Sequence, residues 1–268
     1  MQRRVVGNTS TIMTDEITTQ LEQITIADAP LVRRKPKVSP RTPTRMTPEL
    51  KVKLSEFFIK ATKGYHLLNE DPIKESRWEA INSLVLKTAG CPVSSMSSGS
   101  HRPGSDITCS LGGFSNKSAK YNAQQTKTAI SSYRLTTACS DKDPGTMDKI
   151  IEEIQSRKNF DYYSVIIYTE SDTEILYDWY LIPADHPVMN PSTYQWKPKL
   201  GKKGTKKDTI VGWETDEHEG SSMDITFSMS SQLWIHLAIT PDLRSHLVAS
   251  STVTKGLKYD YITLCDLE

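Results

Sequence analysis

The chain has 268 residues, enough for one large domain or two small ones, with 37% hydrophobic and 24% charged residues, as in ordinary globular proteins. Its formal net charge of +1 excludes a uniformly basic protein but is compatible with local basic patches. The four cysteines form no CxxC pair and have no zinc-finger spacing with histidine. No apolar stretch has the length of a signal peptide or a membrane helix. We therefore expect free thiols in a soluble, intracellular protein of the cytoplasm or nucleus that is not secreted and has no membrane partner.

The first part of the chain, residues 1–46, differs from the rest because it is rich in Thr, Pro and Arg. Within it, residues 32–45 carry six basic side chains, three prolines and no acid. Because proline blocks helix interiors and sheet ladders, we predict an extended or disordered tail. Its charge could contact phosphates without sequence preference, or the segment could be a solvated linker. Residues 47–268 are expected to form a single domain.

Three helices are predicted from capping residues and periodicity. Thr47-Pro48-Glu49 supplies a capping hydroxyl, a proline at the first helical position and an acid in the first turn, and apolar residues follow at helical spacing up to Gly64. A second helix begins in the same way at Asp71-Pro72 and ends at Gly90. Residues 146–157 predict a clearer helix with one apolar side.

The remaining chain predicts mainly strands. Residues 91–104 are crowded with Ser, Gly and Pro and are expected to form a loop. Residues 107–111 and 114–121 flank Gly112-Gly113 and predict a β-hairpin, and the polar segment 121–135 is expected to be helical. Further strands are predicted at 162–169, 174–183, 224–229 and 232–239. This mixture indicates an α/β fold, with a central mixed β-sheet flanked by helices.

The hairpin gathers residues that could do chemistry. If it turns symmetrically about Gly112-Gly113, Asp106 lies opposite Ala119, and Ser118 and Lys120 share one face on either side of that partner. Such a carboxylate, hydroxyl and ammonium would suit phosphodiester hydrolysis, in which acids hold a divalent cation and a lysine polarises water or phosphate. Lys117, which follows Ser115 at the same spacing, is the alternative to Lys120.

These residues resemble a known motif. Residues 103–106, Pro-Gly-Ser-Asp, followed by Ser118-Ala119-Lys120, resemble the PD-(D/E)xK motif of type II restriction endonucleases. The phrases GSHRPGSDI and SSYRLT (residues 99–107 and 131–136) are also similar to restriction-type nucleases of large DNA viruses. The resemblance covers about residues 75–182. It implies a restriction-endonuclease-like fold, with the motif on two strands of a sheet and one or two Mg²⁺ ions bound by its acids.

One feature departs from the family pattern. Ser118 stands where the family usually has an acid before the lysine, although some members take the missing carboxylate from elsewhere. The family often supplies an acid from a helix before the motif, and Glu79 is the matching candidate, with Glu75 as a weaker one. The competing interpretation is that Glu79 is an exposed helix carboxylate, because it lies about 160° from the centre of the apolar stripe.

Other side chains could contact DNA. The segment 196–207 has six lysines and no acid, so it predicts either a backbone contact or a solvated loop. The candidate DNA-binding residues are His101 and Arg102 in the Gly/Ser loop, Gln124 and Arg134 after the motif, and Lys202 and Lys203 in the lysine-rich segment.

The sequence thus predicts a magnesium-dependent DNA endonuclease that acts on double-stranded DNA. Asp106 and Glu79 would bind the metal, Lys120 would assist the attacking water and Ser118 would line the site. Residues 196–239 are assigned to target recognition by elimination, and the resemblance implies a homodimer. Phosphate-binding loops GxxxxGK[ST] and GxGxxG do not occur, so no nucleotide cofactor is expected. The alternatives are a non-catalytic nucleic-acid-binding protein and a structural or assembly protein.

Overall fold

The structure is a computed structural model that describes residues 46–96, 104–256, 258–260 and 262. The chain divides into two units, residues 1–42 and 43–268, and the description concerns the second unit. The predicted tail, except for its last residue, and the candidates His101 and Arg102 lie outside the described residues.

Two helices open the domain, α2 (Pro48–Tyr65) and α3 (Glu75–Thr88). The predicted cap of α2 is confirmed, because the Leu50 N–H donates to Thr47 Oγ1 at 3.2 Å. The predicted start of the second helix at Asp71 is wrong. The backbone of Ile73 is bonded to the sheet instead: its N–H donates to the Tyr177 hydroxyl at 3.0 Å and its carbonyl accepts from Ser118 Oγ at 2.6 Å.

The chain after α3 forms a mixed sheet and further helices. The strands are β1 (Val93–Met96), β2 (Ile107–Cys109), β3 (Gly112–Asn122), β4 (Lys127–Arg134), β5 (Tyr162–Glu170), β6 (Glu174–Pro183), β7 (Trp196–Leu200), β8 (Ile210–Thr215), β9 (Ser222–Thr226), β10 (Gln232–Ala238) and β11 (Leu247–Thr254). The helices are α4 (Met147–Arg157) and the short α5 (Pro241–Ser245). Strand order is β11-β6-β5-β3-β4-β10-β9-β8-β7, with β1 and β2 branching from β3. Only the β3–β5 pair is parallel among the described strands, so the expected mixed sheet flanked by helices is confirmed.

Several predicted elements differ from the structure. Residues 121–135, expected to be helical, are instead the end of β3, a turn and β4. In β4 the buried Thr128 and Ile130 alternate with Lys127 and Ala129, the period of a strand with one face in a core. The strands β1, β7, β8 and β11 were not expected, and the end of the predicted strand 224–229 is a 3-10 turn, η4 (Phe227–Met229).

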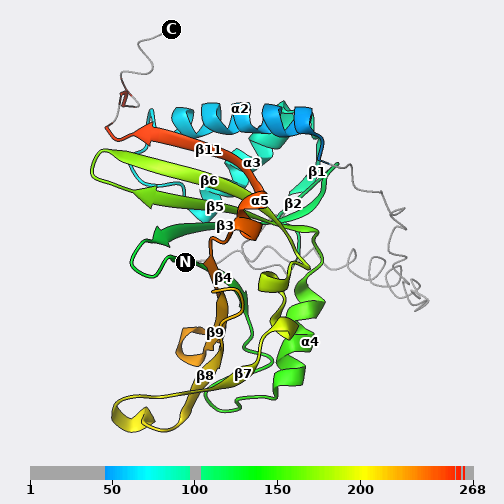
Figure 1. Ribbon diagram of the computed structural model, residues 1–268, viewed down its shortest axis with the longest axis vertical. Helices are drawn as coiled ribbons and strands as arrows, with labels where there is room; N and C mark the ends of the chain where they lie inside the picture. The colour runs from blue at the N-terminus through cyan, green and yellow to red at the C-terminus, as the bar shows by residue number, and fades with distance from the viewer. Residues whose placement is uncertain (1–45, 97–103, 257, 261, 263–268) are drawn as a thin grey trace, which may run out of the picture. The chain divides into compact units, whose positions relative to one another are not determined.

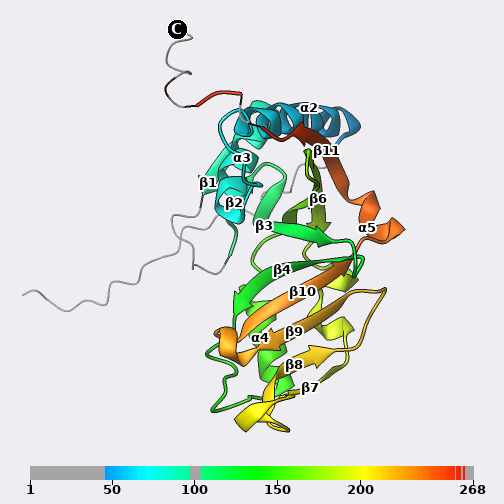
Figure 2. The same cartoon turned by 90° about the vertical axis from the view of Figure 1, so that its left-hand side faces the viewer.

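Two hydrophobic cores lie on opposite faces of the sheet. Between the sheet and α2 and α3, Trp78, Trp179 and Phe58 are fully buried and pack ring against ring. On the other face α4 and the β5 and β10 side chains enclose the second core (Figure 1). Beyond β3 the sheet continues as β4, β10, β9, β8 and β7, and no described helix covers the face of these strands opposite α4 (Figure 2).

No helix in the described part of the chain combines the length and the apolarity needed to cross a membrane.

Candidate active site

The candidate site lies at an opening along one edge of β3. Strand β5 occupies the other edge, whereas β2 pairs with residues 112–114 and β4 with residues 121–122 of the same edge. The stretch between them, residues 115–120, therefore has neither strand beside it. Asp106, which precedes β2, reaches into this opening.

The hairpin register decides which residues meet Asp106. Ile107 pairs with Phe114 and Cys109 with Gly112, so the turn lies at Ser110-Leu111 and the predicted turn at Gly112-Gly113 is wrong. The glycines serve a different purpose. Gly112 has φ 126°, and a Cβ there would meet the Asp161 carboxylate at 2.5 Å, while Gly113 N–H donates to that carboxylate at 2.7 Å. Asp106 therefore does not lie opposite Ala119.

Asp106 is anchored to β3 instead. Its Oδ2 accepts the Asn116 N–H at 2.6 Å, and its own N–H donates to the Phe114 carbonyl at 2.8 Å. Burial raises the pKa of the Asp106 carboxyl above its ordinary value. The Asn116 N–H, the Lys117 ammonium and the Ser115 hydroxyl act in the opposite direction and favour the ionised form.

Lys117 is the cation of this opening. Its ammonium lies 2.8 Å from Glu75 Oε1 in α3, and its side chain is only 12% exposed. It acts electrostatically on both Asp106 and Glu79. The structure thus brings the alternative lysine, not Lys120, to the carboxylates.

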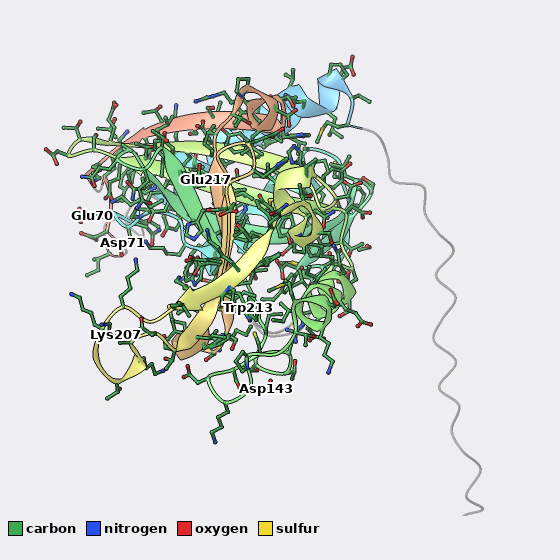
Figure 3. All side chains as sticks on the ribbon, turned by 60° about the horizontal axis from the view of Figure 1, so that its bottom comes forward. Glu70, Asp71, Asp143, Lys207, Trp213 and Glu217 are labelled. Carbon is green, nitrogen blue, oxygen red and sulfur yellow. The ribbon has the colours of Figure 1, made fainter. Side chains whose placement is uncertain are left out.

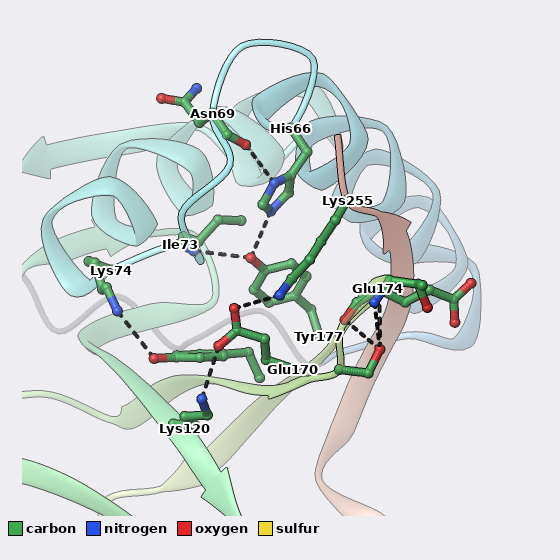
Figure 4. Close-up of polar contacts among 12 residues, drawn as sticks. His66, Asn69, Ile73, Lys74, Lys120, Glu170, Glu174, Tyr177 and Lys255 are labelled. Carbon is green, nitrogen blue, oxygen red and sulfur yellow. Dashed lines mark hydrogen bonds and ion pairs between the residues drawn. The ribbon is translucent and has the colours of Figure 1, made fainter. Parts of the chain in front are cut away.

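Lys120 and Ser118 make other contacts. The exposed Lys120 lies 2.9 Å from Glu170 Oε2, and Lys255 lies 2.8 Å from the other oxygen of the same carboxylate (Figure 4). Ser118 spends its hydroxyl on the Ile73 carbonyl. Both positions follow from the corrected hairpin register, so neither residue joins Asp106 as the symmetric hairpin predicted.

Glu79 faces the opening from α3. Burial is the main cause that raises the pKa of its carboxyl, followed by the negative charges of Asp106 and Glu75, while Lys117 lowers it. Glu75 and Glu79 are one helical turn apart and so lie on one face of α3. Among the described residues, Glu75 has Lys117 as its partner, whereas the Glu79 carboxylate has no hydrogen bond or ion pair.

A buried polar network fixes α3 above this edge. Asn82 Nδ2 donates to Asn116 Oδ1 at 2.6 Å and to Ser164 Oγ at 2.9 Å. Trp179 and Trp78 add indole N–H bonds to the Ser164 side chain and carbonyl. Asn82 is a residue that the sequence interpretation missed. Its signal was present, because a polar side chain stands one turn after Trp78 on the apolar side of the helix.

The remaining predicted DNA-binding residues lie apart from the opening. Gln124 is exposed in the β3–β4 turn, where its N–H donates to Asn122 Oδ1 at 3.0 Å. Arg134 ends β4, and its carbonyl accepts from Arg157. Lys202 and Lys203 are exposed between β7 and β8.

The donor set was tested against the magnesium ion that the resemblance implies. In the described ranges, no group of three or more His, Cys, Asp or Glu side chains is placed to hold a metal. Magnesium is commonly bound by one or two carboxylates and keeps several waters. Asp106 and the unpartnered Glu79, which raises its pKa partly through repulsion from Asp106, match that smaller set. The residues therefore fit a hydrated Mg²⁺ ion.

Comparisons of the chain with models of protein families, with curated proteins and with solved structures gave no match.

Proposed function

We propose that the chain is a magnesium-dependent endonuclease of the restriction-enzyme type, which hydrolyses phosphodiester bonds of double-stranded DNA. The observation that carries the proposal is the convergence of Glu79, Asp106 and Lys117 at the open edge of β3. The three come from a helix, the chain before β2, and β3, and they interact electrostatically in a partly buried setting. Perturbed carboxyl groups with a nearby cation are typical of catalytic sites.

The order of elements supports the resemblance to the PD-(D/E)xK nucleases. The helix that carries Glu79 precedes the motif, the motif lies on two paired strands, β2 and β3, and α4 and β5 follow. With the register of the structure, the motif reads Asp106 and then Ser115-Asn116-Lys117. Ser115, rather than Ser118, then stands in place of the usual acid, and Glu79 supplies the second carboxylate.

Each residue of the site has a distinct role in this proposal. Asp106 and Glu79 would hold Mg²⁺, which would supply Lewis-acid polarisation of the phosphate and activation of a water. Lys117 directs its ammonium at the phosphate or the attacking water, and Glu75 holds that ammonium in position. The Ser115 hydroxyl and the Asn116 N–H keep the Asp106 carboxylate ionised and fixed in orientation.

The partner expectations belong to the same proposal. A homodimer acting on a palindrome follows from the resemblance, since two-fold protein symmetry matches a two-fold site. A nucleic-acid-binding protein without catalysis is the second candidate, and Ser115 in place of an acid is the observation that favours it.

Cleavage of supercoiled plasmid DNA with and without Mg²⁺ tests the proposal. We expect wild type to cut only with the metal, and Asp106→Ala and Lys117→Ala to lose about 10²-fold or more, the scale of a lost catalytic group. Lys120→Ala is the matched control and should cut at the wild-type rate.

The outcomes separate the candidates. Binding without cleavage by wild type would favour the non-catalytic protein. Cleavage that depends on Lys120 and not on Lys117 would overturn the site described above. A chain that neither binds nor cuts DNA would favour a structural or assembly protein.

A further inference from the structure

The connection between β7 and β8 is a folded tip that carries four lysines. We call residues 201–209 the cationic tip. Its backbone closes on itself: Gly201 N–H donates to the Thr209 carbonyl at 2.9 Å, and Asp208 N–H donates to the Gly201 carbonyl at 3.0 Å. A one-turn 3-10 helix, η3 (Gly204–Lys206), fills the tip, and Gly204 and Asp208 take positive φ values of 64° and 61°. The lysines are therefore presented by an ordered turn.

The tip lysines differ from the lysines of the strands beside them. On the strands, Lys197 pairs with Asp216 at 2.6 Å, Lys199 with Asp224 at 2.8 Å, and Lys127 with Glu217. At the tip, Lys206 contacts Asp141 at 3.1 Å.

The other three lysines of the tip are Lys202, Lys203 and Lys207. They are exposed and have no acidic partner within the described ranges. Figure 3 shows the Lys207 side chain extending from the ribbon at the tip. The unpaired positive charge of the hairpin is thus concentrated at its end.

The tip and the candidate site are joined by an uncovered sheet face. The face opposite α4 holds a depression of about 510 Å³, lined by polar side chains that include Lys199, Asp224 and His236. There Asp224 accepts from His236 Nε2 at 2.6 Å as well as from Lys199, and these two cations hold its pKa at about 2. Because the charges on this face are paired, only the tip offers free cations to a polyanion.

We propose that the cationic tip binds the phosphate backbone of double-stranded DNA through Lys202, Lys203 and Lys207. The inference rests on the proposed function and deepens it, because it assigns the grip on the partner to a surface distinct from the reacting residues. Ammonium groups contact phosphates as point charges without reading bases, and the ordered turn reduces the conformational entropy lost on binding. The uncovered face leaves room for an extended duplex between tip and site.

The test measures affinity for a labelled duplex of about two helical turns by fluorescence anisotropy, in EDTA, across about 50 to 200 mM salt. The triple variant Lys202→Gln, Lys203→Gln, Lys207→Gln should bind more weakly. Its plot of log K against log salt concentration should be shallower by about 2.7, at about 0.9 per lost phosphate contact. The matched control is Lys53→Gln, Lys63→Gln, Lys87→Gln, which removes the same charge from exposed positions of α2 and α3 and should keep the wild-type slope.

A second variant tests whether the turn itself matters. A Cβ at residue 201 would overlap the Lys206 carbonyl, so Gly201→Ala must distort the tip while keeping every charge. We expect it to weaken binding as well. Wild-type affinity in Gly201→Ala would overturn the claim that the tip is preformed.

The remaining outcomes are decisive in other ways. Equal losses in the two triple variants would mean that net charge alone governs binding, and an unchanged tip variant would remove the tip from the interface. Wild type that shows no salt-dependent affinity for the duplex would overturn the proposal and point to an acidic protein as the partner. Because the assay contains no Mg²⁺, a chain that binds through the tip but never cuts DNA would refute the nuclease alone.

Discussion

Two carboxyl groups at the open edge of β3 are held where their ionised forms are disfavoured. Burial is the largest cause for both Asp106 and Glu79, and for Glu79 the neighbouring acids add to it. Such groups destabilise the folded chain at neutral pH, and catalytic residues commonly carry this cost. A bound cation would relieve it, since the metal favours the ionised carboxylates.

This cost gives a signed prediction for Glu79→Gln. The raised pKa of Glu79 means that the folded state prefers the protonated carboxyl. Its stabilising contribution is present below the unfolded value of 4.5 and is lost as the pH rises through the raised folded value. Glu79→Gln should therefore melt at a higher temperature than wild type near pH 7, melt like wild type below that unfolded value, and lose plasmid cleavage.

Glu49→Gln is the control of opposite sign. Its pKa is lowered by hydrogen bonds at the start of α2, so ionised Glu49 stabilises the fold and its loss should lower the melting temperature at pH 7. Scanning calorimetry at several pH values measures both variants. A lower melting temperature for Glu79→Gln at pH 7 would contradict the destabilising role assigned to its charge.

At the scale of elements, the junction of α3 with the sheet is polar where a hydrophobic contact would be usual. Ser164 Oγ accepts from both Asn82 and Trp179, and all three residues are fully buried. Asn82 Oδ1 and Asn116 Nδ2 have no hydrogen-bond partner in the described part of the chain. The network is thus not optimised for stability, and we interpret it as fixing the register of α3 over β3, which places Glu79 at the opening.

Ser164→Ala tests that interpretation. It leaves two buried N–H donors without their acceptor, and we expect a loss of about 1–3 kcal/mol in the free energy of unfolding. Cleavage should fall as well, because α3 loses its register. Urea denaturation measures the first effect, with Ser222→Ala on the uncovered sheet face as the control that should stay near wild type. Unchanged stability in Ser164→Ala would show that the network is dispensable.

The sequence predicted the elements whose local signals and packing agree. Helices α2 and α4 and strands β5, β6 and β10 have caps or apolar patterns that match their environments. Strand β4 was mistaken for a helix because half of its residues face away from the core and are polar. Strand β7 was missed because Pro198 and two lysines suit an edge strand, where one side has no partner.

The candidate site was predicted in part for the same reason. Asp106 and Glu79 could be named from residue type and order, but the choice between Lys117 and Lys120 depended on the hairpin register. That register is set by a distant residue, Asp161, against which Gly112 and Gly113 pack. No local pattern around the hairpin carries this information.

At the scale of the whole domain, the candidate site and the cationic tip lie on different strands of one sheet. From β3 to β7 there are five strand spacings along the order β3-β4-β10-β9-β8-β7. At ~4.8 Å each this is ~24 Å, or about seven base pairs at 3.4 Å per base pair.

The separation predicts a length dependence of binding. Affinity should rise once a duplex exceeds about seven base pairs, because one molecule then reaches both surfaces. The triple tip variant should lack this rise. Titrating duplexes of increasing length against both proteins, corrected for the number of binding registers, measures it. The same rise in the variant would mean that DNA does not span from site to tip.

The uncovered sheet face has a consequence for how such a protein can diverge. Along β9 and β10, Met223, Ile225, Leu233 and Ile235 point into the core, while the intervening side chains, such as Asp224 and His236, face outward. Because neighbouring positions of a strand belong to different faces, inheritance can alter every second residue there without disturbing the packed interior. Descendants of this chain are therefore free to acquire new binding preferences on that face while the fold that supports them is inherited intact.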